Sequence, residues 1–101
     1  MSTVDFERHL AEDARLIILR ELAEQVDHRL NTTILSAALY AFGHNRSREW
    51  LDTQINKLVE LGAVDAQRMG TVIVVTLRQA GLDHVERRTV ISGVKRPSIG
   101  G

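Results

Sequence analysis

Cysteine is absent from this chain of 101 residues. Disulfides, thiolate metal sites and cysteine nucleophiles are therefore excluded, and a reducing cytoplasmic location is expected. Long hydrophobic runs are absent too, since no stretch approaches the roughly 18 apolar residues that a membrane-spanning helix requires. We therefore expect a cytoplasmic protein without a membrane partner.

Aromatic residues and proline are scarce. Aromatic residues account for 4% of the chain, and there is a single proline. Apolar residues nevertheless make up 44%, so the core is expected to be mostly aliphatic. A chain of this length suffices for one compact domain and is too short for two.

An excess of charge of one sign is also missing, because the formal net charge is zero. The charges are unevenly distributed: residues 1–45 hold seven acids and four bases, whereas residues 46–101 hold six acids and nine bases. A domain polarised in this way can present its basic half to a polyanion such as DNA. The bias is far milder than in a strongly basic nucleic-acid binder.

Residues 4–26 show the spacing of a long amphipathic helix. Ser2 or Thr3 can cap this helix, and acidic residues in its first turn suit the positive end of the helix dipole. Its apolar positions form two stripes, whereas packing against a single partner requires only one. We therefore expect homodimerisation through the first stripe, which consists of Phe6, Leu10, Ala14 and Ile17.

Two shorter helices are expected next. Residues 32–42 follow a good N-cap, Asn31, and end at Gly43, which suits the left-handed conformation that terminates helices. After a turn over residues 44–46, Ser47 is placed to cap a third amphipathic helix, and Gly62 to end it.

Residues 64–77 have the composition of a β-hairpin. Val64 and Ala66 alternate with polar neighbours, Met69 and Gly70 suit the turn, and residues 71–77 are almost wholly β-branched or aliphatic. Because the second strand is apolar on both faces, it is expected to be largely buried. A last short helix is expected over residues 79–88.

This order of elements predicts an α+β fold that is mainly α with a small β-hairpin, arranged as a winged helix-turn-helix. Residues 1–88 are expected to form a single winged-helix domain with a long N-terminal helix. Residues 89–101 show no hydrophobic periodicity and include Lys95 and Arg96, so a flexible basic C-terminal tail is expected there.

The third helix divides into an apolar arc and a polar arc on a helical wheel. In a helix-turn-helix the polar arc enters the major groove, where Asn can pair with adenine and Lys with guanine or phosphate. Three acids oppose this role, because Glu49, Asp52 and Glu60 outweigh the single lysine of the arc. The candidate DNA-binding residues, including arginines at the helix cap and near the hairpin tip, are Arg46, Ser47, Arg48, Thr53, Asn56, Lys57 and Arg68.

Catalytic and metal sites are not indicated by the sequence. Its four histidines are scattered and lack the i, i+4 spacing of a helical metal pair. Its glycines form no phosphate loop, and its serines lack the strand–turn–helix context of a nucleophile. We therefore expect no enzyme activity, no catalytic residue, no cofactor and no metal.

Two levels of resemblance support the fold. The pattern Leu58, Leu61-Gly62 and Val64 resembles the exit from the recognition helix in many bacterial winged-helix repressors, including ArsR-like and MarR-like proteins. Across nearly the whole chain, further motifs are similar to a family of small ArsR-like or winged-helix proteins of Mu-like phages and prophages. Those motifs are Glu12-Asp13, the segments 15–20 and 22–24, Leu30-Asn31, Gly43-His44, Ser47-Arg48 and the Gly-Val-Lys-Arg-Pro run at 93–97.

The resemblance implies a regulator or accessory factor encoded near packaging genes. One position departs from the pattern, since such proteins usually place Thr after the last hairpin strand, whereas Arg78 follows Leu77 here. Arg cannot accept the backbone N–H bonds that a Thr cap accepts, so the last helix is expected to begin less stably by about 1 kcal/mol. The metal-sensing role of ArsR proteins does not carry over, because the thiolate ligands are missing.

Two functions from different classes remain open at this point. The first is a non-enzymatic, dimeric winged-helix DNA-binding protein that acts as a phage or prophage transcriptional regulator or accessory factor on double-stranded DNA. The second is a protein–protein interaction module in phage packaging or replication, which would dock a basic phage protein on the acidic face of the third helix. A repressor that responds to a small molecule is a weaker third reading, since no residue identifies a ligand.

Overall fold

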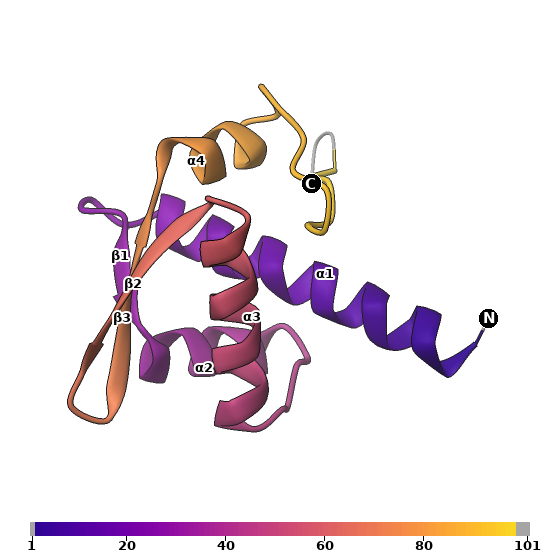
Figure 1. Cartoon of the computed structure of the whole chain (residues 1–101), viewed down its shortest axis with the longest axis horizontal. Helices are drawn as coiled ribbons and strands as arrows, with labels where there is room; N and C mark the ends of the chain where they lie inside the picture. The colour runs from indigo at the N-terminus through magenta and orange to yellow at the C-terminus, as the bar shows by residue number, and fades with distance from the viewer. Residues whose placement is uncertain (1, 99–101) are drawn as a thin grey trace.

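The computed structural model describes residues 2–98, and within this range the chain forms four helices and a three-stranded antiparallel sheet (Figure 1). The predicted α+β class is confirmed. In chain order the elements are α1 (Thr3–Ala23), β1 (Arg29–Asn31), α2 (Thr32–Ala41), α3 (Arg48–Glu60), β2 (Val64–Met69), β3 (Val72–Leu77) and α4 (Gln79–Val85). None of the helices is long and apolar enough to cross a membrane, over the residues that the structure describes.

The helix ends follow the predicted capping chemistry. The side chains of Ser2, Asn31 and Ser47 each accept a hydrogen bond from the backbone N–H three residues later, at the starts of α1, α2 and α3. Gly43 and Gly62 have φ values of 95° and 75°, a conformation that costs glycine little and other residues more. Local side-chain chemistry therefore sets the boundaries of these helices.

The sheet contains one strand more than the predicted hairpin. Its order is β1-β3-β2, with Leu30 opposite Val75 and Ala66 opposite Val75 on the other side. The missed strand, β1, spans only three residues directly before α2, which is too short to show a period-two pattern. The hairpin turn is also shifted by one residue, since Met69 pairs with Val72 and the turn falls on Gly70 and Thr71.

The core is aliphatic, as predicted, and α1 runs through it. The fully buried side chains of α1 pack against those of α2, α3 and β3, on one face of the sheet. The prediction that β3 is largely buried holds for that face only, because Val72 and Val74 on the opposite face are only half-buried. The largest core side chains are Ile18, Leu19, Leu22, Leu35, Ile55, Leu58, Val64 and Val75.

The last helix ends earlier than predicted, at Val85 rather than at residue 88. Arg87 has a φ of 62°, which breaks the helical backbone, and the chain then turns back towards α1. As expected, Arg78 at the N-cap of α4 makes no side-chain capping hydrogen bond. The glycine at position 81 is required by packing, because a Cβ there would lie 2.4 Å from the carbonyl oxygen of Ala63.

Residues 91–95, which lie in the expected flexible tail, pack on α1 and α4. His84 is fully buried, and its Nδ1 accepts from the backbone N–H of Ile91 at 3.0 Å while its Nε2 donates to the carbonyl of Lys95 at 2.9 Å. Arg15 donates to the carbonyl of Gly93 at 2.7 Å, and the side chain of Val94 is 5% exposed. The motion of the tail stays a prediction, and its residues 99–101 lie outside the described part of the chain.

Candidate nucleic-acid or protein interface

Helix α3 presents one buried face and one polar face, as its sequence predicted. Leu51, Ile55 and Leu58 are buried in the core, together with Gln54, whose side chain accepts from Arg15 Nε at 2.9 Å. The opposite face consists of Glu49, Asp52, Thr53, Asn56, Lys57 and Glu60 and lies on the molecular surface. The β2–β3 hairpin lies along one side of this face and partly covers Asp52. The side chains of Glu49, Thr53, Asn56 and Glu60 are exposed, so they are available to a partner.

The loop before α3 holds the first predicted DNA-binding residues. Arg46 lies over the ring of Trp50, with its guanidinium carbon 4.4 Å from the ring centroid, and its Nη2 is 3.2 Å from a carboxylate oxygen of Glu7. Such a cation–π contact is worth about 0.5–1 kcal/mol at an exposed site. Ser47 uses its hydroxyl as the cap of α3. Both residues therefore have structural partners within their own chain.

Arg48 also has an internal partner. Its Nη1 donates to the hydroxyl oxygen of Thr32 at 3.3 Å, and the same oxygen accepts from the backbone N–H of Ile73 at 3.1 Å. Thr32 is fully buried, so these two bonds connect α3, α2 and β3. Arg48 thus helps to fix the position of α3 relative to the sheet.

The side chains in the middle of the polar face make fewer contacts within the chain. The hydroxyl of Thr53 donates to the carbonyl of Glu49 within the helix at 3.0 Å. Asn56 is exposed and Lys57 is half-buried, and neither side chain has a hydrogen bond or ion pair with another described residue. These two side chains are therefore free to bind a partner without breaking an internal contact.

Arg68 extends from β2 towards α3. Its side chain is 61% exposed, and its Nη2 lies 3.9 Å from a carboxylate oxygen of Asp52. The two residues line a hollow of about 310 Å³ between α3 and the hairpin, together with Asn56, Ala66 and Ile73. The other oxygen of Asp52 is buried without a hydrogen-bond partner in the described chain, so the pairing with Arg68 leaves this carboxylate incompletely satisfied.

The electrostatics of the face are those of an acidic surface. Along the polar face of α3, Glu49, Asp52 and Glu60 oppose the single positive charge of Lys57. Two of the arginines expected to offset these acids, Arg46 and Arg68, are close to carboxylates. Surface ion pairs of this kind are weak, at about 0–1 kcal/mol, so a phosphate can replace the carboxylate at little cost.

A cluster around His44 supports the start of α3, and sequence reasoning did not detect it. The buried ring of His44 stacks on Trp50 with a centroid distance of 6.1 Å, and its Nε2 donates to Asp13 at 2.8 Å. Lys95 Nζ donates to the other oxygen of Asp13 at 3.1 Å. Burial acts to raise the pKa of Asp13, but the hydrogen bonds and charges of His44 and Lys95 outweigh burial and hold the pKa below its ordinary value.

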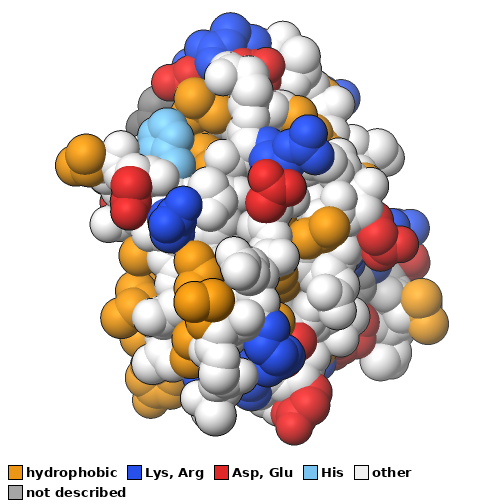
Figure 2. Space-filling model, turned by 60° about the vertical axis from the view of Figure 1, so that its left-hand side comes forward, with side chains coloured by type: hydrophobic (Ala, Val, Ile, Leu, Met, Phe, Trp, Pro, Cys, Tyr) orange, Lys and Arg blue, Asp and Glu red, His pale blue; other side chains and the backbone are white. Residues whose placement is uncertain are grey.

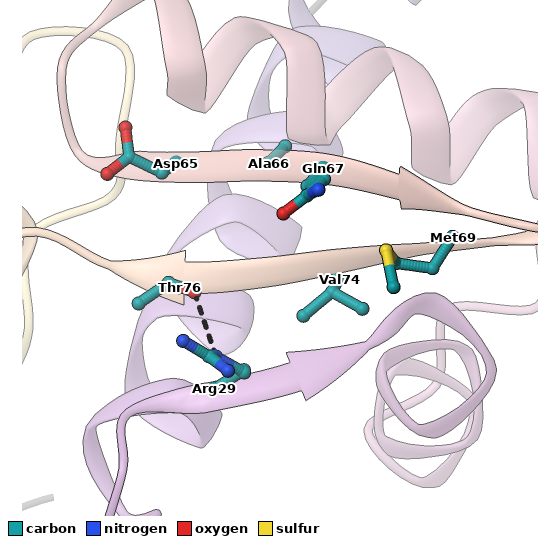
Figure 3. Close-up of a pocket in the computed structure, with 7 residues that line it drawn as sticks. All are labelled: Arg29, Asp65, Ala66, Gln67, Met69, Val74 and Thr76. Carbon is teal, nitrogen blue, oxygen red and sulfur yellow. Dashed lines mark hydrogen bonds between the residues drawn. The ribbon is translucent and has the colours of Figure 1, made fainter.

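A second surface lies on the face of the sheet that points away from the helices (Figure 3). A shallow groove of about 440 Å³ runs across it, and Arg29 Nε donates to the hydroxyl of Thr76 at 3.3 Å within this groove. The sequence did not reveal this groove, because one of its walls is the missed strand β1. Its lining residues are Arg29, Asp65, Ala66, Gln67, Met69, Val74 and Thr76.

The predicted dimer stripe on α1 is divided between core and surface. Ala14 is fully buried by its own chain, whereas Phe6 is 54% exposed. Leu10 and Ile17 are half-buried, and Ile17 packs against the edge of the core. Ala14 is thus a core residue, and pairing of two chains through the rest of the stripe stays a prediction.

The described residues hold no group of three or more His, Asp or Glu side chains that could bind a metal ion. Asp13, His44 and Lys95 satisfy one another, as described above.

The fold and its surfaces define a small α+β protein with a largely exposed polar helix face beside a β-hairpin. The chain is 42% identical over 88 residues to the uncharacterized protein gp26 of Escherichia phage Mu, covering 87% of this chain and 91% of that protein. It is also 30% identical over 66 residues to an uncharacterized protein of Haemophilus influenzae, covering 65% of this chain and 64% of that protein. The chain therefore belongs to the family of the phage Mu protein gp26.

This membership supports the predicted relationship to proteins of Mu-like phages. No protein-family model matches the chain, and no solved structure matches it. Beyond family membership, the function must be argued from the surfaces.

Proposed function

We propose that this protein is a non-enzymatic, cytoplasmic winged-helix DNA-binding protein, acting as a transcriptional regulator or accessory factor of a Mu-like phage or prophage. In this proposal α2 and α3 form the helix-turn-helix, and the β2–β3 hairpin is the wing. Double-stranded DNA is the partner, and no cofactor or metal is needed.

One observation carries the proposal. The polar face of α3 is largely exposed and lies beside the β2–β3 hairpin, with a hollow lined by Asn56 and Arg68 between them. A winged-helix protein inserts such a helix into the major groove of DNA, which is wide enough to admit one α-helix. The hairpin then lies near the adjoining backbone or minor groove.

The side chains on this surface allow different kinds of contact. Asn56 has both a donor and an acceptor, so it can bind the N6 and N7 edge of adenine, and Lys57 can bind guanine or a phosphate. Arg68 is suited to a backbone phosphate near the wing. Thr53 can contact a base edge or a phosphate when its hydroxyl leaves the carbonyl of Glu49.

Positive charge at the N-terminus of α3 offsets part of the acidity. Arg46, Arg48 and the free N–H groups of the first turn lie where helix N-termini commonly bind phosphate. For Arg46, phosphate binding would exchange a weak ion pair with Glu7 for a contact with DNA. Because few cations contact the backbone, binding should be weak at physiological salt and should strengthen as salt is lowered.

A gel-shift series with random duplex DNA at low salt tests this proposal. We expect a complex at micromolar protein, and we expect Asn56→Ala to leave this non-specific complex nearly unchanged because Asn56 contacts base edges. Arg46→Ala combined with Arg48→Ala should weaken it several-fold. A matched unfolding curve is needed, because Arg48 also holds Thr32. The absence of any complex, or no effect of the double arginine variant, would contradict the proposal.

A second function is favoured by the acidic face itself. Glu49, Asp52 and Glu60 would repel phosphates, whereas they would attract a partner protein with lysines or arginines on its docking surface. In this alternative the same fold serves packaging or replication of the phage by binding another phage protein. Cross-linking in phage-producing cells would test it: a partner lost with Glu49→Lys plus Asp52→Lys, in a variant with unchanged stability, supports docking rather than DNA binding.

A further inference from the structure

The outer face of the sheet carries a regular pattern of charge. We define the outer sheet face as the side chains that point away from the helices. Their directions follow from the strand register, because residues directly opposite each other in antiparallel strands share a face. The outer sheet face consists of Arg29, Asp65, Gln67, Met69, Val72, Val74 and Thr76. Asn31 shares this register, but its side chain caps α2, where its Oδ1 accepts from the N–H of Ile34.

Two rows of this face run across all three strands. In the first row Thr76 on the central strand lies between Arg29 on β1 and Asp65 on β2. In the second row Val74 lies beside Gln67 on β2, and the opposite position on β1 is Asn31, whose side chain caps α2. Each row thus has a small or apolar centre, and the first row has opposite charges at its two ends.

We infer that the outer sheet face binds a second copy of this chain, with a two-fold axis running along β3. Rotation about such an axis places the β1 edge of one copy over the β2 edge of the other. Arg29 of each copy then faces Asp65 of the partner subunit. Val74 and Thr76 lie near the axis, where each contacts its own counterpart.

The charge pattern selects this axis over the other one. A two-fold axis running across the strands would stack β1 on β1 and bring the two Arg29 side chains together at one end. Like charges in such positions repel, whereas the axis along β3 turns both charged ends into attractive pairs. The self-complementarity of the face is therefore the reason to choose a second copy as its partner.

The outer sheet face also fits a second copy better than the α1 stripe does. Ala14 of the stripe is fully buried in the core of its own chain. No residue of the outer sheet face is buried: Val72, Val74 and Thr76 are half-buried, and the others are exposed. Met69, at the hairpin end, is 54% exposed and adds apolar area to the rows. This dimer does not depend on DNA binding.

The face is small, so the predicted dimer is weak. Three strands about 4.8 Å apart and six residues at about 3.3 Å per residue give a face of roughly 15 by 20 Å. Stable dimers bury about 800 Å² per partner. We therefore expect dissociation constants in the range of tens to hundreds of micromolar, on the order expected for interfaces below that size.

Sedimentation equilibrium between 10 µM and 1 mM protein, roughly the range that brackets such constants, tests the inference. The wild-type chain should pass from monomer to dimer, and higher salt should shift it towards monomer. Arg29→Glu alone and Asp65→Lys alone should each weaken association about tenfold or more, since each replaces two attractive pairs by repulsive ones.

The decisive step is to mix the two single variants. In the mixture each Arg29→Glu chain can pair with an Asp65→Lys chain through two attractive contacts, so a heterodimer should form at concentrations where each variant alone is monomeric. Arg8→Glu is the matched control, because Arg8 is exposed in the N-terminal part of α1, and that end of the helix projects away from the sheet (Figure 1). It should dimerise like the wild type.

Several results would overturn the inference. A wild-type chain that is monomeric at 1 mM, roughly the upper limit of the expected range, has no such interface. A dimer that survives both charge reversals but is lost with Phe6→Ser belongs to α1. Failure of the mixed variants to associate would also reject the axis along β3. Each of these outcomes leaves the gel-shift result unaffected.

Discussion

His84 links the C-terminal segment to the body of the molecule. Its ring is fully buried, and both ring nitrogens bind backbone groups of residues that follow α4. The N–H of Ile91 requires Nδ1 to be an acceptor, so the neutral tautomer with the proton on Nε2 is the form that satisfies both bonds. These two hydrogen bonds explain how residues 91–95, which have no hydrophobic periodicity, are held in place beside α1.

The first prediction concerns His84→Leu, which keeps most of the side-chain volume but removes both hydrogen bonds. Two partly buried backbone groups, the N–H of Ile91 and the carbonyl of Lys95, then lose their partner, at about 1–3 kcal/mol each. We expect the free energy of unfolding to fall by roughly 2–4 kcal/mol. Urea denaturation measures it. His9→Leu, at an exposed position, should change stability by less than about 0.5 kcal/mol. Equal effects of both substitutions would reject the role of His84.

The second prediction concerns Asp13 and pH. Its pKa is held below the ordinary value of 3.8, because the hydrogen bonds from His44 and Lys95 outweigh burial of the carboxylate. A lowered folded-state pKa contributes stability that is fully present above the unfolded pKa and is lost as pH falls through the folded pKa. Asp13→Asn should therefore destabilise the protein at pH 6, and the difference from wild type should shrink below about pH 4. Unfolding curves at both pH values give the comparison, and a difference that grows towards acid would contradict the assignment.

At the scale of the element, the start of α4 shows what a missing cap does. Arg78 occupies the N-cap with extended backbone angles, φ −97° and ψ 166°, but its side chain accepts no hydrogen bond from the first turn. The backbone is therefore already in the conformation that a capping residue adopts. Only the acceptor oxygen is missing.

The third prediction is that Arg78→Thr stabilises the protein by about 0.5–1 kcal/mol, since Thr can accept one of the free N–H groups of α4. Arg78→Ala is the matched control, because it removes the same side chain without supplying an acceptor. Thermal unfolding of the two variants isolates the cap. If both variants shift the midpoint equally, capping is not the cause.

The elements that the sequence predicted well are those whose ends are set by local chemistry. Ser47 and Gly62 mark α3 within one or two residues, since a cap and a left-handed glycine act on the adjacent backbone. Strand β1 was missed because Arg29–Asn31 becomes a strand only by pairing with β3, far along the chain. The packing of Val94 on the core was missed for the same reason, because its neighbours Gly93 and Lys95 are held by hydrogen bonds from Arg15 and His84.

The candidate site was likewise predictable only where local sequence determines it. The polar face of α3 followed from helical periodicity, and the structure places Thr53, Asn56 and Lys57 on that face. Periodicity cannot tell which arginines have partners, so the contacts of Arg46 with Trp50 and of Arg48 with Thr32 required three-dimensional coordinates. The groove on the outer sheet face required β1, which the sequence did not reveal.

At the scale of the whole molecule, the surface carries charges of both signs side by side. Figure 2 shows basic and acidic side chains interspersed over one face, with hydrophobic side chains gathered towards its lower left. With a formal net charge of zero and charges mixed on this face, long-range attraction of DNA is expected to be weak. If it binds DNA, close contacts at α3 and the hairpin must supply the affinity.

The most direct test of the DNA-binding proposal is the salt dependence of binding to a labelled random-sequence duplex, measured by fluorescence anisotropy for the wild type, Lys57→Ala, Arg68→Ala and the control Arg8→Ala. The account predicts a linear fall of log affinity with log salt, and Lys57→Ala and Arg68→Ala should each reduce that slope by about one unit. Arg8→Ala should leave the slope unchanged, because Arg8 lies on α1 away from the proposed interface. No binding at low salt, or a slope that none of these substitutions alters, would contradict the claim that α3 and the hairpin bind DNA.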